Sequence, residues 1–189
     1  MLSTLVVEKI ALEEHLFSVA RGGSVTYTAI NTGMFFDRAL DLGLIVDVRR
    51  DRKPTMLWDG GKVKLSVSTL DLVGEAVTNA LLRKDEVVDR VLYVHTAAIT
   101  QQQLSGYAKE LAPDMEIQTL PVDTAELEKR TLEKMRDGES RPKVVRRLMA
   151  RSTFGLGLGL FERTDNGLLG LREWTEDELK TFIAKYVHN

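Results

Sequence analysis

The amino-acid sequence predicts an α/β fold, in which helices flank a parallel sheet. Two observations lead to this prediction. Segments with the alternating pattern of strands take turns along the chain with segments whose apolar residues recur at helical spacing. The composition, with 43% hydrophobic and 29% charged residues, is that of an ordinary globular protein. With 189 residues and no internal repeat, the chain is expected to form one compact unit.

The N-terminal part predicts a helix, a strand and a second helix. Residues 4–20 carry leucines at helical spacing between glutamates, which is typical of an amphipathic helix. Ser24–Ile30 alternates and is rich in Val, Thr and Tyr, which favours a strand. Asn31–Gly33 breaks that strand, and Met34–Leu44 has the pattern of a short apolar helix.

The middle of the chain predicts a hairpin followed by a helix. Thr55–Trp58 and Lys62–Ser68 flank Asp59–Gly61, and a glycine-containing turn between two strand-like runs is typical of a β-hairpin. The helix that follows has one apolar stripe, and Asp71 or Ser68 is expected to cap it.

The rest of the chain continues the alternation of strands and helices. We expect strands at Val87–Thr96 and Met115–Leu120. Helices are expected to begin at Thr100, at Asp123, at Pro142 and at the capping box Thr175-Glu176-Asp177-Glu178.

The overall charge and the residue usage exclude several classes of function. The net charge of -2 and the pI near 6.0 give no general attraction to nucleic acid or to anionic lipid. No apolar run is long enough to span a bilayer and no signal-type segment opens the chain, so we expect a cytoplasmic protein. Because the chain has no cysteine, disulfides, thiolate nucleophiles and Cys-based zinc sites are excluded.

The glycine-rich run Gly155–Gly159 is the segment that most resembles a phosphate-binding loop. A dinucleotide site needs G-x-G-x-x-G directly after a strand, so that bare amides and a helix start meet the pyrophosphate. This run has another spacing and follows a basic helix, which favours a flexible loop. The Tyr-x-x-x-Lys pair of many short-chain dehydrogenases is also absent, because Leu5 stands where the tyrosine of Lys9 would be.

Lys9 lies within the leucine stripe of the first predicted helix, and two interpretations are open. Burial of a lysine disfavours the ammonium form, which would fit a residue that exchanges a proton during catalysis. The alternative, which the pattern alone favours, is a packed stem with the ammonium group in water.

Three other groups of residues have a structural interpretation as well as a functional one. The histidines, at positions 15, 95 and 188, show no metal-ligand spacing, so no metal site is expected. The basic positions of residues 143–151 follow a helical face, which favours a solvated surface over a nucleic-acid site. The cluster Met34-Phe35-Phe36 follows a strand end and either lines an apolar pocket or belongs to the core.

Several segments resemble the NmrA-like and isoflavone-reductase-like family of atypical short-chain dehydrogenases, with its fungal members closest. The resemblance begins with residues 8–16 and with residues 25–37, which read Val-Thr-Tyr-Thr-Ala-Ile-Asn-Thr-Gly-Met-Phe-Phe-Asp. It continues in the same order through Leu57–Gly61, Ser68–Gly74, Val91–Val94 and Gln103-Leu104, so it covers most of the chain.

This resemblance implies a fold, a cofactor and a set of site residues. The fold would be a partial Rossmann-like parallel sheet with flanking helices plus a small C-terminal α+β substrate region, and the cofactor NADP(H) or NAD(H). Lys9 matches the lysine that serves in catalysis without a tyrosine partner. The loop after the strand lies beside the nicotinamide in that family, which assigns Asn31, Thr32 and Gly33 to the cofactor and Met34, Phe35 and Phe36 to the substrate pocket.

The start of the chain differs from that family, whose members begin with a glycine-rich turn and several βα units. We therefore expect an N-terminally truncated form that is inactive alone, with residues 1–50 as the remainder of the Rossmann-like domain and residues 51–189 as the substrate side. Its partners would then be a small-molecule substrate and, through an exposed sheet edge, a second chain. Two alternatives are a non-catalytic interaction domain and a regulatory module that binds dinucleotide without turnover.

Overall fold

The structure is a computed structural model that describes residues 4–23, 25–49, 54–139 and 141–187. In chain order the elements are α1 (Thr4–Arg21), β1 (Thr28–Asn31), β2 (Met34–Phe35), α2 (Phe36–Asp41), β3 (Thr55–Trp58), the 3₁₀ turn η1 (Asp59–Gly61), β4 (Leu65–Ser68), α3 (Leu70–Leu82), α4 (Lys84–Val87), β5 (Arg90–Tyr93), β6 (Ala97–Ile99), α5 (Gln101–Leu111), β7 (Thr119–Val122), α6 (Thr124–Arg136), α7 (Arg141–Ala150), the π-helical turn η2 (Arg151–Gly155) and α8 (Glu176–Val187). The predicted alternation of strands and helices is confirmed.

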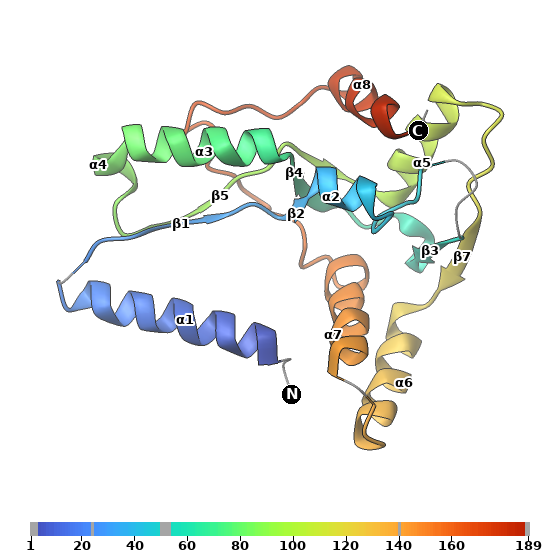
Figure 1. Ribbon diagram of the computed structural model, residues 1–189, viewed down its shortest axis with the longest axis horizontal. Coiled ribbons are helices and arrows are strands. Elements are labelled where there is room, and N and C mark those ends of the chain that lie inside the picture. The colour runs from blue at the N-terminus through green and yellow to red at the C-terminus, as the bar shows by residue number, and fades with distance from the viewer. Residues whose placement is uncertain (1–3, 24, 50–53, 140, 188–189) are drawn as a thin grey trace.

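The strands form three small sheets, two of which are purely parallel. β1 pairs in parallel with β5, so that Asn31 lies opposite Tyr93. β4 lies between β2, which runs parallel to it, and β6, which runs antiparallel. β3 pairs in parallel with β7. In Figure 1, α1 lies on one side of β1 and β5 and α3 lies on the other, so the predicted parallel α/β arrangement is present.

The hairpin predicted around Asp59–Gly61 is wrong. η1 does not reverse the chain into a neighbouring strand, because the Asp59 carboxylate accepts the backbone N–H of Thr124, at 2.8 Å, and ties the turn to α6. β3 therefore lies beside β7, whereas β4 enters the core with all four residues buried. A fully buried central strand needs neighbours on both edges, which β2 and β6 supply.

The helix starts show which local signals decided the structure. Thr100 caps α5 in a capping box with Gln103, and Asp123 caps α6, so both predicted starts are confirmed. The cap of α3 is Thr69 rather than Asp71 or Ser68, because its hydroxyl accepts the N–H of Leu72. The apolar helix predicted for Met34–Leu44 is shorter: β2 takes its first two residues, and α2 covers Phe36–Asp41.

Two clusters of buried side chains form the core. The larger one lies between α2, β4, β6, α5 and α8, and its fully buried members include Phe36, Leu65, Leu104 and Ile183. The smaller one joins α3 and β5 to the loop before α8 through Leu92 and Leu169. The two clusters flank the region where β1 and β5 end.

α1 has the predicted length, but its leucine stripe does not face the core at Leu12, which is 69% exposed. The helix reaches the rest of the molecule near its C-terminal end, where the rings of Phe17 and Tyr27 lie 4.8 Å apart. The side chain of Lys9 lies outside the described residues, so its environment stays a prediction.

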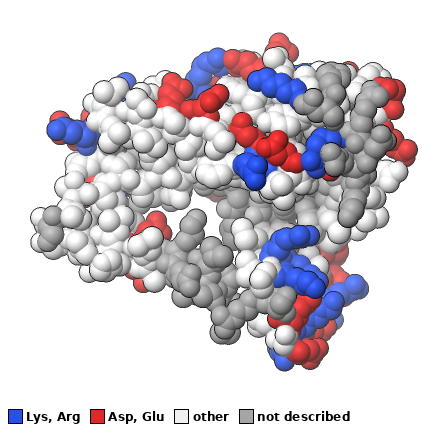
Figure 2. Space-filling view, in the orientation of Figure 1, with Lys and Arg blue, Asp and Glu red and all other residues white. Residues whose placement is uncertain are grey.

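The α6–α7 pair projects from the body and mixes both signs of charge, as Figure 2 shows. Arg147 pairs with Glu139 at 2.5 Å, and Arg151 pairs with Glu128 at 3.2 Å. These ion pairs partly neutralise the basic face that the sequence indicates. Among the described residues, no helix is both long and apolar enough to cross a membrane.

Candidate functional site

The candidate site lies where β1 and β5 end. The carbonyl oxygen of Asn31 accepts the N–H of Val94 at 2.9 Å, which fixes the chain as it leaves β1. In open α/β sheets, ligands bind beyond the carboxyl ends of the parallel strands. The side chains of Asn31 and Thr32 are partly exposed, and within the described part of the chain neither makes a hydrogen bond. Both are therefore available to a ligand.

Gly33 holds the turn after β1 against β4. Its φ of +64° is in the left-handed region, and a Cβ atom at this position would lie 2.4 Å from the carbonyl oxygen of Ser66. Only glycine satisfies both the conformation and the close approach. Gly33 itself is exposed, so the turn presents bare backbone to solvent beside the two free polar side chains.

The three apolar residues after Gly33 have different surroundings. Met34 is half-buried, and Phe35 is 44% exposed at the surface. Phe36 is fully buried and stacks on Phe182 of α8, with 5.5 Å between the ring centroids. Thus Met34 and Phe35 remain accessible to a ligand, whereas Phe36 supports them from the core.

Ser66 and His95 form a buried polar pair under the Gly33 turn, and sequence reasoning missed it. The Oγ atom of Ser66 lies 2.9 Å from Nδ1 of His95, and the two residues are 1% and 4% exposed. Nε2 of His95 lies 3.0 Å from a carboxylate oxygen of Glu173. The two atoms are not aligned as a hydrogen bond, and Nε2 has no hydrogen-bond partner among the described residues. No local pattern signals this contact, because it joins β4 to the connection between β5 and β6, 29 residues further along the chain.

The same Ser66 also contacts the segment that precedes α8. Its Oγ accepts the backbone N–H of Phe161 at 3.0 Å, and its own N–H donates to the carbonyl of Gly159 at 2.9 Å. Because its hydroxyl is enclosed in this way, Ser66 is not an accessible nucleophile. The Ser66–His95 pair is suited to holding backbone segments in place.

A surface hollow and a metal centre are two other kinds of site that the described residues could form. A shallow hollow lies at the opposite end of β1, between Phe17, Ala20, Arg21, Tyr27 and Asp89. It is remote from the Gly33 turn along the strand. Over the same part of the chain, no group of three or more His, Asp or Glu side chains is arranged to hold a metal ion.

Comparisons with known proteins show the fold of the chain. Neither a protein-family model nor a curated protein matches the sequence. Among solved structures, the complex of leucoanthocyanidin reductase with NADPH from Vitis vinifera has a TM-score of 0.63 and 11% identity, and covers 94% of this chain. A structure described as pinoresinol-lariciresinol and phenylcoumaran benzylic ether reductases has a TM-score of 0.60, 17% identity and 88% coverage.

A nucleoside-diphosphate-sugar epimerase from Staphylococcus aureus is also similar, with a TM-score of 0.57, 14% identity and 88% coverage. The chain therefore has a Rossmann-like α/β fold similar to that of these structures, which confirms the predicted α/β fold. It spans only 54 to 60% of the length of these structures. At such identities the likeness establishes the fold alone.

Proposed function

We propose that this chain forms the nicotinamide-side and substrate-side part of an NAD(P)H-dependent reductase of the isoflavone-reductase-like type. The observation that carries the proposal is the exposed Gly33 turn, held against Ser66 at the carboxyl end of β1. This turn lies at the position where folds of this class bind their ligands. One of the similar solved structures is a complex with NADPH.

The residues of the turn suit the nicotinamide end of a dinucleotide. The free side chains of Asn31 and Thr32 supply polar groups that would hold the cofactor, and exposed Gly33 allows it to approach the backbone. Met34 and Phe35 offer apolar surface to a substrate, with Phe36 behind them. NADPH, when bound, would supply a hydride to a conjugated or carbonyl substrate.

Lys9 completes this proposal as the proton donor or polarising cation. As the hydride adds to the substrate, negative charge develops on the substrate oxygen or at the conjugated position. The Lys9 ammonium would stabilise that charge or donate a proton to it, and water would then reprotonate the amine. Replacing Lys9 with Ala in a form that turns over substrate should abolish turnover and leave cofactor affinity nearly unchanged. Lys9→Arg, which keeps the charge but holds its proton more firmly, separates the two roles.

The first experiment is a titration of NADPH into the purified chain, followed by nicotinamide fluorescence. Saturable binding that weakens in Asn31→Ala and Thr32→Val supports the proposed cofactor site. Binding that is identical in these variants places NADPH elsewhere. Binding without turnover of any offered carbonyl or conjugated substrate favours the regulatory module, and no binding at all contradicts the proposed function.

A second candidate function is pairing with another copy of the chain through β1. In the described parts of the chain this strand pairs with β5 alone, and its alternation directs the N–H groups of Thr28 and Ile30 toward the other edge. Sedimentation velocity tests it: Thr28→Pro, which removes one of these donors, should dissociate a dimer that Thr28→Val leaves intact. A wild-type chain that stays monomeric at high concentration contradicts this function.

A further inference from the structure

The connection between η2 and α8 is a long segment without helix or strand, residues 156–175. Its second half is fixed along the outer edge of β5. The N–H of Asp165 donates to the carbonyl of Tyr93 at 2.6 Å, and the side chain of Asn166 bonds both backbone groups of His95. Trp174 donates to the carbonyl of Thr96 at 2.9 Å. Connections of this length without regular structure are uncommon in compact domains, and they are often functional.

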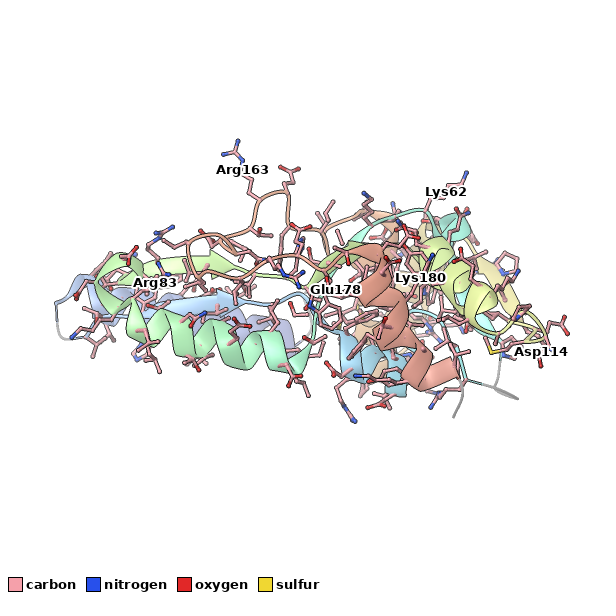
Figure 3. The ribbon with its side chains drawn as sticks, turned by 90° about the horizontal axis from the view of Figure 1, so that it is seen from above. Lys62, Arg83, Asp114, Arg163, Glu178 and Lys180 are labelled. Atoms are coloured by element: carbon pink, nitrogen blue, oxygen red, sulfur yellow. The ribbon has the colours of Figure 1, made fainter. Side chains whose placement is uncertain are left out.

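The first half, residues 156–163, is held far less firmly. Some of its hydrogen bonds are internal or go to η2. Among the described residues, those that join it to the rest of the molecule all involve Ser66. Glu162 and Arg163 are exposed, and Figure 3 shows Arg163 projecting from the body of the molecule. We call residues 156–163 the flap. Its hydrogen bonds to the body therefore depend on one buried serine, and the ring of Phe161 lies edge-on to Tyr93, with 5.1 Å between the centroids.

The flap carries apolar side chains that the fold leaves in solvent. Leu156 is 54% exposed and Leu158 is 71% exposed. They alternate with glycines, and Gly157 has a φ of +71°, which gives this segment the backbone freedom of a hinge. Because Ser66 also lies against Gly33, the flap begins beside the turn that the proposed function assigns to the cofactor.

We propose that residues 156–163 form a flap that closes over the Gly33 turn when a ligand binds, and that His95 is the positioning residue that clips the flap to β4 through Ser66. With its proton on Nε2, His95 accepts the hydroxyl hydrogen of Ser66 at Nδ1. The lone pairs of Ser66 Oγ are then directed toward the N–H of Phe161. The side chain of Asn166 in turn fixes the backbone of His95. The firmly held second half of the connection therefore positions the His95 side chain that orients Ser66 toward the flap.

Limited digestion with trypsin at Arg163 tests the clip in the ligand-free protein. Ser66→Ala removes the acceptor of Phe161, and His95→Leu removes the partner that orients Ser66. Each should raise the rate of cleavage after Arg163 by about tenfold, which corresponds to the loss of one buried hydrogen bond. His95→Asn, whose amide oxygen takes the place of Nδ1, should restore much of the wild-type rate.

Ser68→Ala is the matched control, because Ser68 is equally buried on β4 but bonds Val94 instead of the flap. Circular dichroism at the digestion temperature verifies that each variant is folded. Cleavage at the wild-type rate in both Ser66→Ala and His95→Leu would overturn the proposal. So would equal acceleration in Ser68→Ala.

The closure of the flap over a ligand rests on the proposed function. Adding NADPH distinguishes a failure of the closure from a failure of the proposed function. In a chain that binds NADPH by fluorescence, saturating cofactor should slow cleavage at Arg163 in the wild type but not in Ser66→Ala. Binding without any protection would overturn the closure. An absence of NADPH binding counts against the proposed function, while the ligand-free cleavage rates still decide whether Ser66 and His95 hold the flap.

Discussion

Gly33 and Ser66 lie in direct backbone contact, such that a Cβ atom at position 33 would lie only 2.4 Å from the Ser66 carbonyl oxygen. This contact fixes the end of β1 relative to β4, two strands that belong to different sheets. Through the same serine, the turn is joined to His95 and to the flap. The arrangement of the candidate site therefore depends on a single glycine.

We predict that Gly33→Ala destabilises the protein by at least about 2 kcal/mol, because the left-handed conformation and the clash with backbone each oppose the methyl group. Urea denaturation measures the change. Gly74→Ala is the matched control: this glycine lies inside α3 with open space around its Cβ position, so the same substitution should stabilise by about 0.5–1 kcal/mol. Equal effects at both positions would show that the Gly33 contact is unimportant.

The sequence was informative where short-range chemistry decides the structure. The capping residues Thr100, Asp123 and Thr175 each bond to backbone groups within the next three residues, so their patterns predict helix starts directly. The turn at Asn31–Gly33 is likewise predicted from local residues, because Asn and Gly interrupt the strand pattern. The strand pairing of Thr55–Trp58 was missed, because its partner lies beyond seven other elements of the chain.

The candidate site was likewise predictable only where its features are local in the sequence. Gly33 is visible in the sequence as a glycine after a strand, but its reason, the carbonyl of Ser66, comes from tertiary structure. His95 shows no metal-ligand pattern and Ser66 is one of two serines in its strand, so their contact has no counterpart in the sequence. The assignment of Lys9 depends on resemblance and stays a prediction.

We predict that truncation to Ala has very different effects on stability at the two neighbouring phenylalanines. Phe36→Ala should cost about 3–5 kcal/mol, because a fully buried ring that stacks on Phe182 would leave a cavity. Phe35→Ala should change stability by less than about 1 kcal/mol, since that ring is 44% exposed. In the proposed reductase, Phe35→Ala should instead weaken substrate binding. Thermal unfolding and substrate titration separate these effects, and a strongly destabilised Phe35→Ala would contradict the assignment of that ring to the surface.

We predict that Gln101 is essential for joining α5 to β3. Its side-chain amide donates to the carbonyls of Ile45 and Met56, at 2.6 and 2.8 Å, and accepts the N–H of Trp58 at 3.0 Å, while the residue is 1% exposed. Gln101→Leu leaves these backbone groups unpaired and should cost about 3 kcal/mol in denaturant unfolding. Gln102→Leu, at the adjacent exposed position with one bond to Gly60, should cost less than about 1 kcal/mol. Similar losses in both variants would contradict this assignment.

We predict that Glu178 contributes to the acid sensitivity of the fold. Hydrogen bonds from Arg172, from the Thr175 backbone N–H and from the Thr175 hydroxyl lower the pKa of Glu178 from its ordinary 4.5 to about 2. Figure 3 shows this residue and Lys180 on α8. Because the pKa is lower in the folded than in the unfolded state, the stabilisation is fully present above pH 4.5 and is lost as the pH falls toward 2.

Glu178→Gln should therefore flatten the decline of stability over this range, as measured by thermal unfolding at a series of pH values. The effect should be small and weakened by salt, because the Arg172–Glu178 pair is partly exposed. Arg172→Gln removes the largest cause of the shift and should reproduce most of the change. If the wild type and Glu178→Gln lose stability in parallel as the pH falls, the acid sensitivity of the fold arises from other carboxylates.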